Sequence, residues 1–312
     1  MAPSPVKKNP RRNSLLIKEE REFYMFISPW LFGFVFLTLG PLLVSLIMSF
    51  TQWEIISPPK WIGGRNYLSM YRDPLFRQSL KVTTIYTVLD VPLRMAASLL
   101  VALALNQKIL GARWYRTFYY MPSVIPAVAV SMLFLWILAP KGLLNALLGM
   151  VGIPPQKWLT SSKLALYSLV LMSLWGYGSS MVIFLAGLQG IPQQLYEAAE
   201  IDGANRWRRF IHITIPMLSP VILFNTVMAM IGTFQVFTTG FLVTGGGPNN
   251  ATLFYALYLY RSAFEYFEMG YACALAWVLF LIILLLTLIT FRSSAAYVYY
   301  EGEIRQQRRW AI

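Results

Sequence analysis

The residues of this 312-residue chain with the most evident chemistry form a short polar stretch between two long apolar segments. Glu197 and Glu200 follow Pro192, which favours a helix start, so both carboxylates lie near the positive end of a helix dipole. Gly203 can adopt the left-handed turn that ends such a helix. The small side chains between the glutamates would let another protein approach closely. This stretch therefore predicts a docking surface rather than a catalytic site.

The second half of the polar stretch is basic and ends at a proline. A second short helix is expected from Ala204, and it contains Arg206, Arg208 and Arg209. This helix would have to end before Pro216, because proline lacks an N–H and is a good first residue for the membrane helix that follows. The whole stretch is predicted to be a helix-turn-helix outside the bilayer.

The chain contains few of the residues that enzymes use for catalysis. Cys273 is its one cysteine and His212 its one histidine, so no metal cluster, disulfide framework or Cys/His nucleophile pair can form. The sequence also lacks the G-x-x-x-x-G-K-[ST] phosphate loop. We expect no catalytic residue, metal or cofactor here, and any ATP and Mg²⁺ would have to be bound by a separate subunit.

Composition indicates an integral membrane protein, because 57% of the residues are hydrophobic and 12% are charged. Six stretches are long enough to cross a bilayer of about 30 Å, which takes roughly 20 residues. They are residues 24–50, 80–105, 118–138, 164–188, 217–241 and 270–291. A transmembrane β-barrel would alternate apolar and polar residues, and these stretches do not. The expected fold is all-α with six transmembrane helices.

The distribution of lysine and arginine predicts the orientation. With the N-terminus inside, the cytoplasmic segments contain about twice as many of these residues as the outer segments, which favours N-in and C-in. We expect a basic cytoplasmic tail at 1–22, attracted to anionic lipid, a transmembrane domain at 23–291 with the polar loop at 189–216, and a cytoplasmic tail at 292–312. The net charge is +13, but the lysines and arginines that produce it flank the apolar segments instead of forming one continuous basic stripe. A nucleic-acid partner is therefore not expected.

The polar loop resembles the signature of the permease subunits of bacterial binding-protein-dependent ABC importers: EAA, three residues, Gly, nine residues and Ile-x-Leu-Pro. The matching positions are Glu197, Ala198, Ala199, Gly203, Ile213 and Pro216. Ile215 replaces the usual Leu, which conserves volume. Residues 106–108, 116–122, 245–248 and 299–303 look like the maltose-type, sugar-uptake branch of this family, in its first-permease type.

The resemblance implies a multi-subunit transporter of which this chain is one subunit. In the family, this loop, here called the coupling loop (189–216), seats in a cytoplasmic ATPase and transmits its closure to the membrane helices. The implied partners are a second permease in a heterodimer, two ATPase subunits and an extracytoplasmic solute-binding protein. The implied function is alternating-access import of a sugar or oligosaccharide across the bacterial cytoplasmic (inner) membrane. An importer for another solute, such as a glycerol phosphate, and a secondary transporter are the alternatives.

The resemblance also implies a substrate pathway on the fourth and fifth spans. Carried over without gaps from the signature, its positions are Met172, Trp175, Gly176 and Ser179, then Ala229, Gly232, Thr233 and Val236. Each set is spaced 0, 3, 4 and 7, which places it on one helical face. Trp175 offers a flat platform for a sugar ring. Close helix packing through the glycines is the alternative interpretation.

Asp90 and Arg94 are charged residues within the second predicted span. Because they are four residues apart, they share a helical face and can pair. Either one alone would cost roughly 2.5–3.5 kcal/mol to insert, so we expect both to face the bundle or a wet cavity. A structural ion pair and a role in the substrate pathway or in gating both remain open.

Overall fold

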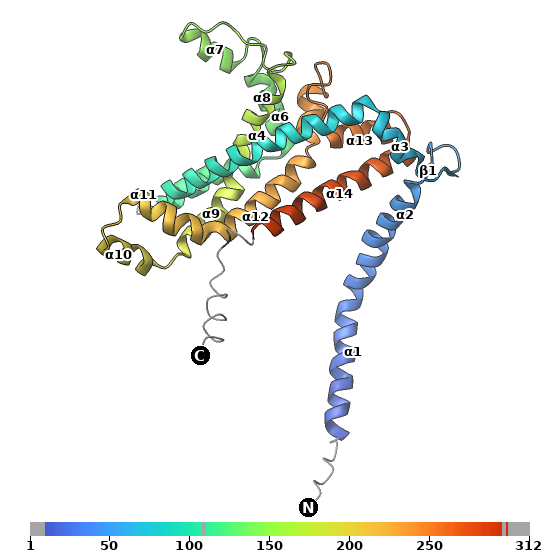
Figure 1. The fold of residues 1–312 in the computed structure, drawn as a ribbon, viewed down its shortest axis with the longest axis horizontal. Helices are drawn as coiled ribbons and strands as arrows, with labels where there is room; N and C mark the ends of the chain where they lie inside the picture. The colour runs from blue at the N-terminus through green and yellow to red at the C-terminus, as the bar shows by residue number, and fades with distance from the viewer. Residues whose placement is uncertain (1–9, 108–109, 295–297, 299–312) are drawn as a thin grey trace, which may run out of the picture.

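Long helices dominate the computed structural model, which describes residues 10–107, 110–294 and 298 (Figure 1). Four of these helices are long and apolar enough to cross a membrane: Lys18–Met48, Pro74–Leu105, Arg206–Phe234 and Met269–Ser294. Two bent helix pairs raise the number to six if each pair crosses once. The predicted helical membrane protein is confirmed at this level, and the count of six and the N-in, C-in orientation stay predictions.

The first span is one continuous helix made of α1 (Pro10–Gly33), a π-helical turn η1 (Phe34–Leu39) and α2 (Gly40–Met48). The predicted N-terminal tail is therefore helical from Pro10 onward, and residues 1–9 lie outside the described part. Only α2 packs against the bundle, on α14 (Met269–Ser294), and α1 diverges from it (Figure 1). The predicted C-terminal tail lies outside the described residues, except for the end of α14 and Val298.

The third and fourth spans were expected to be single helices at 118–138 and 164–188, and both are bent. The third comprises α5 (Ala112–Tyr120), η2 (Met121–Val124) and α6 (Ala127–Ile137), with a bend of 91°. Pro126 explains the break, because it lacks an N–H and forces Ile125 into an extended conformation, ψ 131°. The fourth comprises α8 (Ala165–Ser173), η3 (Leu174–Gly176) and α9 (Gly178–Gln189), with a bend of 49°.

The expected break before Pro216 is wrong. After α10 (Gln193–Ile201), one helix runs from α11 (Arg206–Arg209) through η4 (Phe210–Thr214) into α12 (Ile215–Phe234). The wider π-helical turn just before Pro216 lets the helix continue despite the backbone hydrogen bond that proline cannot make. The turn η1 does the same before Pro41. The span also ends at Phe234 rather than at 241, and a separate π-helical turn, η5 (Gly240–Thr244), follows.

The connections at one end of the bundle have structure of their own. Strands β1 (Thr51–Gln52) and β2 (Lys60–Trp61) pair antiparallel, a small exception to the all-α expectation. Helices α3 (Arg65–Arg72) and α13 (Tyr255–Phe264) belong to the same set of connections, and α7 (Leu143–Met150), between the third and fourth spans, extends away from the bundle beyond α8 (Figure 1). Figure 1 shows α3, β1 and α13 opposite α10 and α11, and we call their end of the bundle the outer end.

The core forms where α4 (Pro74–Leu105) crosses the other helices. This helix packs against α8, α9, α12 and α13, and α9 also packs against α12. Gly187 lets α9 and α12 approach closely, because a Cβ there would lie 2.9 Å from the side chains of Leu218 and Val221. The bundle therefore holds the fourth and fifth spans, with the coupling loop between them, in fixed contact with α4.

Candidate functional site

The coupling loop turns where the sequence predicts. Gly203 has φ +75°, in the left-handed region, and α10 ends in hydrogen bonds from Asp202 N to Ala198 O (3.0 Å) and from Ala204 N to Ala199 O (2.8 Å). Asn205 then caps α11 by accepting from Arg208 N at 2.8 Å. These local bonds fix the angle between the two helices, because they satisfy backbone groups that the helix ends leave free.

The surface of the coupling loop is accessible over α10. Glu197 and Ala198 are exposed, and Ala199 is half-buried. Glu200 pairs with Arg209 at 2.8 Å across the turn, although 70% of the Glu200 side chain stays exposed. The loop thus presents carboxylates and small side chains to a partner.

The base of the coupling loop is anchored to the membrane helices. The Tyr196 hydroxyl lies 2.9 Å from Thr214 Oγ1, which joins α10 to the turn before α12. Tyr196 and Ile213 also pack against the apolar cluster that contains Leu188 and Leu218. A displacement of α10 would therefore be transmitted to α9 and α12 through these packed side chains.

A cavity of about 280 Å³ opens between α4, α6, the bend of the fourth span and the segment after α12. Six of the ten predicted pathway residues line it: Met172, Trp175, Gly176, Ser179, Val236 and Arg94. Trp175 is 39% exposed and its ring meets that of Phe134 edge-on at 5.9 Å. We call this space the central cavity.

The other four predicted pathway residues do not line the central cavity. Ala229, Thr233 and Asp90 are buried in the bundle, and the Thr233 hydroxyl donates to Met230 O of its own helix. A Cβ added at Gly176 or Gly232 would meet no atom within 4 Å in the described part of the chain. Close packing inside this chain therefore does not explain either glycine.

The expected pairing of Asp90 with Arg94 is confirmed. Arg94 Nη2 lies 2.8 Å from Asp90 Oδ2, the Asp90 side chain is fully buried, and 24% of the Arg94 side chain is exposed. The Ser173 hydroxyl donates to Asp90 Oδ1 and connects the pair to the bend of the fourth span. Among the described residues, Arg94 Nε has no hydrogen-bond partner. The guanidinium thus lies between its carboxylate and the central cavity.

Sequence reasoning missed several lining residues of the central cavity, including Tyr86, Ser123 and Thr239. Tyr86 precedes Asp90 by four residues, as Asp90 precedes Arg94, so helical spacing could have identified it. Ser123 lies within η2 and Thr239 immediately before η5, in segments outside the long helices where helical spacing gives no such signal.

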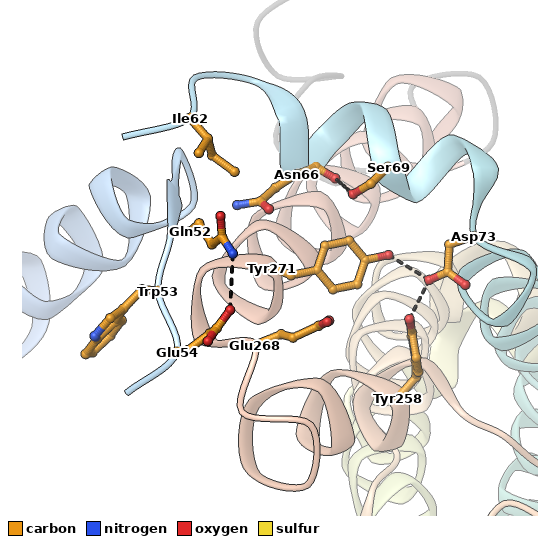
Figure 2. A pocket seen from close by; sticks show the side chains of 10 residues that line it. All are labelled: Gln52, Trp53, Glu54, Ile62, Asn66, Ser69, Asp73, Tyr258, Glu268 and Tyr271. Carbon is orange, nitrogen blue, oxygen red and sulfur yellow. Dashed lines mark hydrogen bonds between the residues drawn. The ribbon is translucent and has the colours of Figure 1, made fainter. Parts of the chain in front are cut away.

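A second polar pocket, of about 400 Å³, lies at the outer end (Figure 2). Asp73 accepts hydrogen bonds there from Tyr258 and from Tyr271, the latter at 2.7 Å, so it joins the start of α4 to α13 and α14. Burial alone would raise the pKa of Asp73, but these bonds and the backbone N–H of Leu75 lower it below the ordinary value. Burial, with Asp73 and Glu54 nearby, raises the pKa of Glu268. The ionised Asp73 therefore stabilises this junction at neutral pH and loses that contribution as the pH falls through its lowered pKa.

Comparisons with known proteins agree with the architecture. Residues 94–299 match the family described as binding-protein-dependent transport system inner membrane component. The chain is 44% identical over 298 residues to the probable ABC transporter permease YesP of Bacillus subtilis, covering 94% of this chain and 96% of that one. It is 31% identical to the arabinooligosaccharide permease AraP of the same organism, covering 95% of each. A crystal structure of a bacterial transporter that imports alginate superposes with a TM-score of 0.81 at 23% identity, covering 92% of this chain and all of that one.

Proposed function

This chain belongs to the family of inner membrane components of binding-protein-dependent transport systems, and we propose that it forms half of the pathway for a sugar or oligosaccharide in an ATP-driven importer. It is a multi-pass membrane subunit for transport and not an enzyme. The proposed location is the bacterial cytoplasmic membrane, with both termini and the coupling loop in the cytosol.

The coupling loop is the observation that supports this proposal most strongly. Its two helices meet at the left-handed Gly203, present Glu197 and Ala198 outward, and connect to the fourth and fifth spans through Tyr196. A partner that closes around α10 would move the two spans that border the central cavity. The proposed partners are two ATPase subunits at this loop, which would bind ATP and Mg²⁺, and a second permease that completes the pathway beside this chain.

The central cavity favours a neutral, hydroxyl-rich substrate. Trp175 provides a flat apolar surface, and Ser123, Ser179 and Thr239 supply hydroxyl groups around it. Arg94 is the one cation among its described lining residues, and Asp90 already neutralises it. A phosphorylated solute would need an unpaired cation, so the glycerol phosphate alternative has less support. The name of AraP agrees with a neutral carbohydrate.

Uptake measurements on the reconstituted assembly test the proposal. The chain, a second permease, the ATPase subunits and the binding protein are placed in vesicles with sugars that the binding protein retains. We expect uptake that requires ATP and the binding protein together. Uptake that follows a proton gradient without an ATPase subunit would show a secondary transporter instead.

A further inference from the structure

Two lysines at the outer end line one cavity on the flank of the bundle. This cavity has a volume of about 440 Å³ and lies between α4 and the start of α8, where Lys81 and Lys163 meet Gln78 and Ser162. No carboxylate is among its described lining residues, and neither lysine forms an ion pair within the described part of the chain. The cavity, here called the lysine cavity, thus combines two positive charges with polar groups that can donate hydrogen bonds.

An exposed apolar surface continues from the lysine cavity toward the coupling-loop end. On α4, Ile85 and Val88 follow Lys81 at spacings of four and seven, so the three share a helical face. On α8, Tyr167 and Leu171 follow Lys163 at spacings of four and eight. All four of these apolar side chains are exposed. Helices α4 and α8 pack together, and on each of them the exposed apolar side chains follow the lysine along the helix.

The lysines mark the depth at which the apolar part of each span begins. After Lys81 the next charged residue is Asp90, and after Lys163 none occurs before Glu197. Lysine at such a boundary extends its ammonium group toward the polar headgroups of the bilayer while its stem stays in apolar surroundings. These positions are the ones expected for a cavity at headgroup level, with acyl-chain depth beyond it along both helices.

We propose that the lysine cavity binds the phosphate headgroup of an anionic phospholipid, whose acyl chains lie along the exposed faces of α4 and α8. The two ammonium groups pair with the headgroup charge, and Ser162 donates to its oxygens together with the one amide N–H of Gln78 that is not used in its 3.1 Å bond to Asn250 O. A carboxylate of the binding protein would match the charges as well, but it would make no use of Ile85, Val88, Tyr167 and Leu171. The lipid accounts for the charged and the apolar parts together.

Lipid retention by the intact assembly tests this site. The full-length chain, purified with its partner subunits, is mixed with phosphatidylglycerol or with phosphatidylcholine, and the lipid that stays bound is measured by native mass spectrometry. We expect preferential retention of phosphatidylglycerol. The double variant Lys81→Ala/Lys163→Ala should weaken that retention by about fivefold per lysine, the factor for about 1 kcal/mol at an anionic lipid surface.

Two matched variants separate site binding from a general charge effect. Lys60→Ala/Lys141→Ala removes the same charge from the outer end and should leave retention unchanged, and Lys81→Arg/Lys163→Arg should preserve it. Equal retention of both lipids by the wild-type assembly would overturn the proposal. So would a Lys81→Ala/Lys163→Ala assembly that loses its binding protein but keeps its phosphatidylglycerol, because the lysines would then serve protein docking.

Discussion

Two ion pairs of equal length lie in very different surroundings in this protein. Arg94 meets Asp90 at 2.8 Å inside the bundle, with the carboxylate fully buried, and Arg209 meets Glu200 at 2.8 Å in the coupling loop, with 70% of the Glu200 side chain exposed. A buried charge that loses its partner is strongly destabilising, whereas an exposed pair contributes little in water. The contrast indicates that the wall of the central cavity depends on its ion pair for structure, whereas the coupling loop does not depend on the Glu200–Arg209 pair for its fold.

The largest effect is expected from removing one member of the buried pair. Arg94→Met leaves the Asp90 carboxylate without its cation, which should cost about 3–5 kcal/mol of folding free energy. Thermal unfolding of the purified assembly and its yield from membranes measure this loss. Asp90→Asn/Arg94→Met, which removes both charges, should recover most of the stability. A single variant as stable as the wild type would show that water reaches Asp90 and that the contrast between the two pairs is false.

Changing the turn tests the coupling loop without touching its charges. Gly203→Val places a β-branched residue at φ +75°, which should cost about 1–2 kcal/mol locally and uncouple ATP hydrolysis from uptake. Gly203→Asn is the matched control, because asparagine tolerates the left-handed region and a Cβ here meets nothing within 4 Å. The ratio of sugar imported to ATP hydrolysed is the measurement. If both variants uncouple hydrolysis from uptake to the same extent, the added side chain rather than the backbone conformation matters at this position, and normal coupling in Gly203→Val would contradict the assigned turn.

The central cavity can be tested through its aromatic wall. Trp175→Ala should reduce substrate-stimulated ATP turnover by about tenfold, equivalent to about 1.4 kcal/mol, because it removes the platform for a sugar ring. Trp175→Phe should keep most of the stimulation, since a flat ring remains. Trp136→Ala removes an exposed tryptophan that does not line the cavity, and it serves as the control. Unchanged stimulation in Trp175→Ala would remove this residue from the proposed pathway.

The sequence predicted the parts of both regions that depend on local geometry. The left-handed turn at Gly203 follows from the conformational freedom of glycine, and the Asp90 to Arg94 pair follows from a spacing of four on one helix. The family resemblance supplied Met172, Trp175 and Ser179, helical spacing put them on one face, and all three line the central cavity. In each case the relevant partner lies within one or two helical turns.

The features that the sequence did not predict depend on contacts between distant segments. Ser123 and Thr239 reach the central cavity because the third span bends by 91° and the η5 segment after α12 packs against α6. Pro216 predicted a helix break, but the π-helical turn η4 absorbs the missing hydrogen bond and the helix continues. Ala229 and Thr233 are buried in the bundle, whereas Val236 lies beyond the end of α12 at Phe234, so the helical spacing that groups these three residues does not extend to Val236.

The smallest effect is expected at the exposed ion pair. Glu200→Gln should change the free energy of unfolding by less than about 1 kcal/mol, because the Glu200 carboxylate is mostly solvated in the wild type and added salt already screens its pair with Arg209. Uptake by the reconstituted assembly should change by less than about twofold. Arg209→Gln breaks the same pair from the other side and should give the same small change. If Glu200→Gln stopped uptake while Arg209→Gln did not, Glu200 would act through a contact with the ATPase, and the coupling loop would use this carboxylate for docking rather than for its own turn.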